Sequence, residues 1–201
     1  MAELEAQLDA LVRDVVVPVL KPLGYAKSAL RWTRRAAEAV YLIGLQRSDG
    51  NGPGHLRFYV NVGAYVPKFA HVIGKPVIDA PKEPDCHWRA RLEKVTGWAV
   101  DCVDVEAWSG GAPSGLGQAL AEADAVLAGI DGAAALVRML DTPPLFGGLN
   151  LDLFAYRCAT GDIDGASRQV DAASVRFGAE PRWVRLQALF DQTAAKFGIV
   201  L

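Results

Sequence analysis

The sequence lacks the basic excess that most nucleic-acid-binding domains carry. Its 21 Lys and Arg residues nearly balance 23 Asp and Glu residues, which leaves a formal net charge of −2. Arg31, Arg34 and Arg35 form a local basic cluster. Charges of this kind often protect the edge of a sheet from pairing with another chain. We therefore interpret the cluster as a solvated strand edge and expect no nucleic-acid partner.

Cysteine is also scarce, and long apolar runs are missing. Cys86, Cys102 and Cys158 form an odd set without a CxxC pair, which is typical of free thiols in a reducing compartment. No apolar run approaches the length of a membrane span. The first residues, MAELEAQLDALVRD, are acidic and amphipathic, unlike a secretory or transit peptide. These features predict a cytoplasmic protein with no membrane partner.

Complete motifs for catalysis or metal binding are absent as well. The histidines share no ligand spacing, and HExxH, HxH and GxSxG do not occur. GGAPSG at residues 110–115 imitates a phosphate loop but lacks its lysine, and DIDG, which begins at Asp162, lacks the other ligands of a calcium loop. A turn with Asp162 as a helix N-cap explains the second motif. Asp104 and Glu106 would share a strand face, but no partner base is evident. We expect no catalytic residue, no metal and no cofactor.

The sequence does contain a strong hairpin pattern at Val40–Val66. A turn rich in Gly, Asn, Asp and Pro, SDGNGPG, separates two β-prone runs. In the second run, apolar residues alternate with polar and aromatic ones, as in a strand with one buried face. The apolar set is Leu56, Phe58, Val60, Val62 and Ala64. We expect this set to pack beneath the first helix.

Periodicity elsewhere predicts the remaining elements. A helix is expected over Ala2–Leu20, with a kink or early end at Pro18, because proline removes a backbone hydrogen bond. A long irregular loop is expected over Val66–Asp85, which contains several prolines. A helix capped by Ser114 follows the glycine-rich Ser109–Gly117, and a helical stack ends the chain. The other predicted strands are Tyr25–Arg34, Val40–Arg47, Cys86–Leu92 and Gly97–Val105.

These elements define an α+β fold. It is an antiparallel sheet of four to five strands with the N-terminal helix packed on it, followed by a helical C-terminal region. We expect two domains, a sheet domain at residues 1–108 and a helical region at residues 109–201.

Several short motifs of the first half resemble an uncharacterised bacterial family, domain of unknown function 4304. The similarity covers roughly Leu4–Trp98, and the family carries no activity that could be transferred. The matching residues are Leu23, Gly24 and Tyr25, then Gln46 and Ser48, then Asn61 and Gly63, and finally Cys86, Arg91 and Leu92. The chain departs from the family by having only Trp98 where a tryptophan-rich segment is expected.

The polar face of the hairpin is the candidate binding surface. Aromatic and arginine side chains dominate binding hot spots, and this face offers both. The candidate residues are Gln46, Ser48, Arg57, Tyr59, Asn61 and Tyr65. Alternatively, C-terminal helices cover this face, and Gln46 and Asn61 satisfy buried backbone groups.

The leading functional hypothesis is therefore a binding or protein-interaction module for a protein partner or a small ligand. The alternative is a hydrolase or transferase whose site lies between the sheet and the proline-rich loop 67–85, with His71 or His87 acting with Asp85. A third hypothesis is a structural homodimer built through the helical tail.

Overall fold

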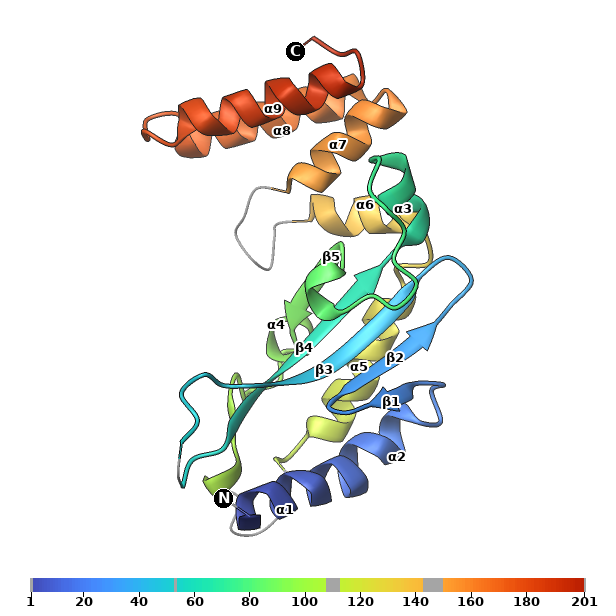
Figure 1. Cartoon of the computed structure of the whole chain (residues 1–201), viewed down its shortest axis with the longest axis vertical. Helices are drawn as coiled ribbons and strands as arrows, with labels where there is room; N and C mark the ends of the chain where they lie inside the picture. Colours follow the sequence, from blue (N-terminus) through green and yellow to red (C-terminus); the bar gives the residue numbers. More distant parts are fainter. Residues whose placement is uncertain (1, 53, 108–112, 143–149, 201) are drawn as a thin grey trace. The chain divides into compact units, whose positions relative to one another are not determined.

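The computed structural model describes residues 2–52, 54–107, 113–142 and 150–200 (Figure 1). Its contacts divide the chain into two compact units. The first, called the sheet unit, comprises Met1–Val66 and Asp79–Met139, and the second, called the helical unit, comprises Pro67–Ile78 and Leu140–Leu201. The expected boundary at Ser109 and the first three residues of GGAPSG lie outside the described residues. The division into domains 1–108 and 109–201 stays a prediction.

A six-stranded antiparallel sheet forms the centre of the sheet unit. The strands lie in the order β1-β2-β3-β4-β5, and β6 pairs with the first residues of β4. The predicted α+β class, with an antiparallel sheet, is confirmed. The strands are β1 (Ala26–Ser28), β2 (Arg31–Arg35), β3 (Val40–Arg47), β4 (Arg57–Tyr65), β5 (Trp88–Arg91) and β6 (Val103–Asp104).

The β3–β4 hairpin agrees closely with the pattern read from the sequence. β3 has the predicted bounds, and β4 begins one residue after the start of the predicted run. Every member of the alternating apolar set from Leu56 to Ala64 is at most 2 % exposed. Because side chains alternate across a strand, this set defines one buried face of the sheet.

Helices cover that apolar face. The predicted first helix is present as α1 (Ala2–Leu11), η1 (Val12–Val16) and α2 (Val17–Leu20), and α5 (Leu116–Ala128) packs beside it (Figure 1). Instead of ending the helix, Pro18 follows a π turn in which Val17 N–H donates to Val12 O. This wider turn accommodates the proline, which has no N–H for the carbonyl four residues earlier.

Three local predictions about strands and loops are wrong. The expected strand Tyr25–Arg34 is the hairpin β1–β2, which turns at Ala29 with φ 53. The expected strand Gly97–Val105 is mostly irregular because α4 (Leu92–Thr96) ends in a left-handed Gly97, and only the two residues of β6 pair. The loop 66–85 contains α3 (Pro67–Val72) and η2 (Glu83–Asp85).

The predicted cap of α5 is also wrong. Its N-cap is Gly115, with φ 82, and no side chain caps the helix. Ser114 instead accepts a hydrogen bond at its carbonyl from Trp98 Nε1, at 3.0 Å. The remaining short elements of this part of the chain are η3 (Val105–Ala107) and α6 (Ala133–Asp141).

Arg34 does not lie on a solvated edge, which corrects the interpretation of the basic cluster. Its strand lies between β1 and β3 in the sheet, and its guanidinium forms an ion pair with Asp124 of α5 at 2.6 Å. The guanidinium also lies over the rings of Tyr25 and Tyr41, 5.4 and 4.8 Å from their centroids. Tyr25 Oη donates to the same carboxylate at 2.8 Å. Burial and the neighbouring carboxylate raise the pKa of Tyr25.

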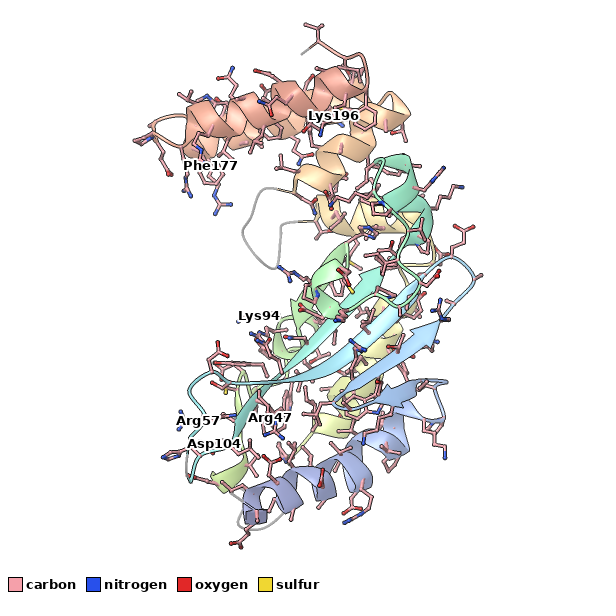
Figure 2. All side chains as sticks on the ribbon, viewed as in Figure 1. Arg47, Arg57, Lys94, Asp104, Phe177 and Lys196 are labelled. Carbon is pink, nitrogen blue, oxygen red and sulfur yellow. The ribbon has the colours of Figure 1, made fainter. Side chains whose placement is uncertain are left out.

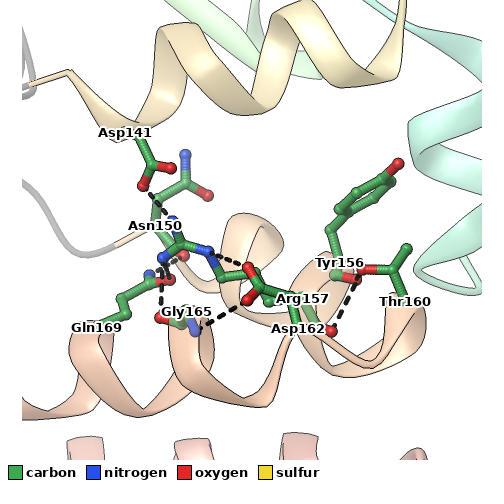
Figure 3. Close-up of polar contacts among 8 residues, drawn as sticks. All are labelled: Asp141, Asn150, Tyr156, Arg157, Thr160, Asp162, Gly165 and Gln169. Atoms are coloured by element: carbon green, nitrogen blue, oxygen red, sulfur yellow. Dashed lines mark hydrogen bonds and ion pairs between the residues drawn. The ribbon is translucent and has the colours of Figure 1, made fainter.

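The helical unit has its own apolar cluster, in which Phe154 and Phe190 pack edge to face. Asp162 caps α8 by accepting from Gly165 N–H, as predicted. Arg157 is buried beside this turn and pairs with Asp141 and Asp162 (Figure 3). The helices are α3, α7 (Leu151–Thr160), α8 (Ile163–Phe177) and α9 (Trp183–Lys196).

Candidate functional site

Three of the predicted binding residues meet on the sheet face opposite the helices. Gln46 and Tyr59 are cross-strand partners. Asn61 lies two residues after Tyr59 on β4, so its side chain is on the same face of the sheet. Asn61 Nδ2 donates to Gln46 Oε1 at 2.8 Å. Gln46 is exposed, Tyr59 is half-buried, and Asn61 is 7 % exposed. The side-chain amides of Gln46 and Asn61 are thus hydrogen-bonded to each other beside an accessible surface.

Arg91 of β5 completes the group. Its Nη1 donates to Asn61 Oδ1 at 2.6 Å and to Gln46 Oε1 at 3.3 Å. Its guanidinium carbon lies 4.1 Å from the centroid of the Tyr59 ring, a close cation–π contact. We call these four residues, Gln46, Tyr59, Asn61 and Arg91, the Arg91 cluster.

The Arg91 cluster holds a cation without a balancing acid. In the described part of the chain, no carboxylate pairs with Arg91, whose acceptors are neutral amide oxygens. Other arginines of the sheet unit pair with acids, as Arg47 does with Glu5 at 2.6 Å and Arg89 with Glu83 at 3.5 Å. The positive charge of the cluster is therefore locally uncompensated.

Sequence reasoning did not assign Arg91 to the site. It lies 30 residues beyond Asn61, and only the β4–β5 register, which pairs these two residues, brings them together. Arg91 belongs to the residues that carry the family resemblance, and this is the one signal in the sequence that marks it.

The structure places Ser48 and Arg57 away from this cluster, near the hairpin turn. Ser48 closes the turn, since its N–H donates to Arg57 O at 2.9 Å and its Oγ accepts from Gly50 N–H at 3.3 Å. Arg57 pairs through Nε with Asp104 at 2.8 Å (Figure 2). Both residues thus have local partners that account for their positions.

Tyr65, the last predicted residue, is buried, with 1 % of its surface exposed. Its ring stacks on that of His87, with 4.7 Å between the centroids. Part of the polar face is covered by η2 and the residues after it, because a Cβ on Gly63 would lie 2.8 Å from Cys86 Sγ. The face is thus split into a covered half at Gly63 and Tyr65 and an accessible half at the Arg91 cluster.

The residues proposed for the alternative enzymatic site have structural partners of their own. His87 Nδ1 accepts from Val66 N–H at 3.0 Å, which places a proton on Nε2 of the neutral ring. Asp85 accepts from Lys82 N–H at 2.7 Å within its own turn. His71 lies on α3, in the helical unit. The pKa of the neighbouring Cys86 thiol is raised to about 12 by burial, which makes its thiolate scarce at neutral pH.

Among the residues that the structure describes, no group of three or more His, Cys, Asp or Glu side chains is placed to hold a metal ion. In the same ranges, no helix has both the length and the apolar composition that crossing a bilayer requires.

Comparisons with known proteins agree with the resemblance seen in the sequence. Residues 16–109 match the family model described as Domain of unknown function (DUF4304). No curated protein and no solved structure matches the chain. The match includes all six strands and the whole Arg91 cluster. The N-terminal half of this chain is therefore similar to the DUF4304 family.

Proposed function

We propose that the sheet unit is a binding module that uses the Arg91 cluster to hold a protein partner or a small ligand. One observation carries the proposal. The Arg91 guanidinium is fixed by two amide acceptors and an aromatic ring, yet no acid of the described chain neutralises it.

This arrangement lowers the cost of binding. A free arginine side chain loses conformational entropy when it is ordered at an interface. Here the Tyr59 ring and the oxygens of Gln46 and Asn61 already restrict Arg91, so less entropy remains to be lost. Arginine and tyrosine are also the side chains most enriched at binding hot spots.

The chemistry of these four side chains favours recognition over bond making. Amides, a guanidinium and a phenol donate and accept hydrogen bonds, which is what the recognition of a polar ligand requires.

The test compares what the full-length protein retains from an extract of its native host. Arg91→Gln removes the charge and the ring contact but keeps a polar side chain, and Arg185→Gln changes an exposed arginine of α9 as the matched control. We expect Arg185→Gln, but not Arg91→Gln, to retain the same proteins or metabolites as the wild type, identified by mass spectrometry. Circular dichroism should show equal folding of the variants. Identical retention by Arg91→Gln would overturn the proposal.

A further inference from the structure

The free edge of the Arg91 guanidinium indicates what kind of group the site accepts. Both hydrogen bonds of Arg91 use Nη1. Nε and Nη2 have no acceptor among the described residues, and these two nitrogens form one side of the planar guanidinium. Two parallel N–H donors of this kind match the two oxygens of a carboxylate. Because Tyr59 stacks on the guanidinium, the direction of this edge is already set.

A second arginine lies on the same row of the sheet. The strand register pairs Arg31 with Gly44, Gly44 with Asn61, and Asn61 with Arg91. These four residues therefore share one face of the sheet. The Cα atoms of Arg31 and Arg91 are three strand spacings apart, which is roughly 14 Å. Arg31 is half-buried and has no hydrogen-bond acceptor or acid among the described residues.

The surface between the two arginines is open at Gly44. A Cβ placed on Gly44 would meet only Leu30 O within 4 Å, at 3.9 Å, and no side chain. Its backbone is not in the left-handed region, so the glycine is not required by φ. The missing side chain leaves room for the body of a ligand between Arg31 and the Arg91 cluster.

We propose that this row recognises a ligand with two carboxylates, one held by the Nε–Nη2 edge of Arg91 and the other by Arg31 across Gly44. The proposal rests on the proposed binding function and specifies its ligand chemistry. The two carboxylates belong either to a small dicarboxylic acid or to acidic side chains of a peptide.

The test titrates ¹⁵N-labelled full-length protein and follows the Gly44 amide and the Arg91 Nε–H by NMR. The probes are adipate, which has two carboxylates, and hexanoate, which has the same chain length and one. We expect adipate to bind about ten-fold more tightly, since the second charge-assisted hydrogen bond contributes about 1.4 kcal/mol. The peptide arm compares acetyl-Glu-Gly-Glu-amide with acetyl-Glu-Gly-Gln-amide.

Two variants assign the two carboxylates to their arginines, a third tests the open space at Gly44, and a fourth is the control. Arg91→Gln should abolish binding of both acids, whereas Arg31→Gln should reduce adipate affinity to that of hexanoate. Gly44→Leu should fill the open space and weaken adipate binding, and Arg185→Gln should change nothing.

Equal affinities for adipate and hexanoate in the wild type, unchanged adipate binding in Arg91→Gln, or tighter binding of inorganic phosphate would overturn the inference. So would the absence of shifts with both the diacid and the acidic peptide. If these probes fail while retention from the native extract still depends on Arg91, the binding function stands and only its ligand chemistry is wrong. If retention does not depend on Arg91, the function itself fails.

Discussion

At the scale of single residues, the arginines of this chain differ in what balances their charge. Arg34 is balanced by Asp124 inside the fold, with side chains 23 % and 11 % exposed. Arg13 pairs with Asp14 at the surface, where the side chains are 72 % and 58 % exposed. Arg91 is held by neutral groups alone among the described residues. A partly buried charge without its partner is costly, whereas an exposed pair contributes little to stability.

This contrast predicts that Asp124→Ala destabilises the protein by about 3 kcal/mol, since it leaves the Arg34 charge and the Tyr25 hydroxyl without their acceptor. Asp14→Ala is the control and should leave the free energy of unfolding almost unchanged, because an exposed ion pair contributes little to stability. Urea unfolding followed by circular dichroism measures both. Equal losses would mean that the Arg34–Asp124 pair is no more important than a surface pair.

At the scale of elements, local patterns predicted the hairpin and the helices but not the places where a turn interrupts a pattern. β3 and β4 were predictable because both runs are rich in β-prone residues, the apolar residues of β4 alternate, and a glycine-rich turn separates the two runs. The β1–β2 turn at Ala29 was missed because it has no Gly, Asn or Pro to mark it. The burial of Tyr65 was not predicted because the residues that cover it, η2 and the segment after it, are distant from β4 in the sequence.

The close packing of Cys86 against Gly63 gives a prediction for β4. Gly63→Ala places a methyl group 2.8 Å from Cys86 Sγ and should destabilise the protein by about 1–3 kcal/mol through overpacking. Gly44→Ala, in the neighbouring strand, is the matched control and should cost nothing measurable, because its methyl group meets no side chain. Thermal unfolding of both variants gives the comparison.

A double-mutant cycle shows whether Cys86 is responsible. Adding Cys86→Ala to Gly63→Ala should recover part of the loss, because residues in contact are not additive. Simple additivity of the two substitutions would mean that the segment around Cys86 does not press on Gly63.

At the scale of the whole molecule, the candidate site could be predicted only in part. Gln46, Tyr59 and Asn61 belong to one hairpin, so their common face follows from period-two alternation. Arg91 and Arg31 join them through pairings of β4 with β5 and of β2 with β3. Sequence patterns predict that strands exist, but the register of distant strands depends on the packing of the complete sheet.

The two units have separate apolar cores, and a buried arginine tests whether they unfold separately. Arg157 donates to Gly165 O and Gln169 Oε1, both at 3.1 Å, and forms ion pairs with Asp141 and Asp162 (Figure 3). Arg157→Met keeps the apolar stem but removes the hydrogen bonds of the buried guanidinium to Gly165 O and Gln169 Oε1, at a cost of about 2 kcal/mol. The two carboxylates are half exposed and regain water, so they add little to this cost.

We therefore expect amide hydrogen exchange in Arg157→Met to become faster in α7 and α8 but to remain unchanged in β3 and β4. The exposed Arg168→Met, also on α8, is the control and should leave both regions as they are. Local opening exposes only the amides of the unit that opens, whereas global unfolding exposes all of them together. An equal loss of protection in β3, β4, α7 and α8 would show that the sheet unit and the helical unit unfold as one cooperative structure.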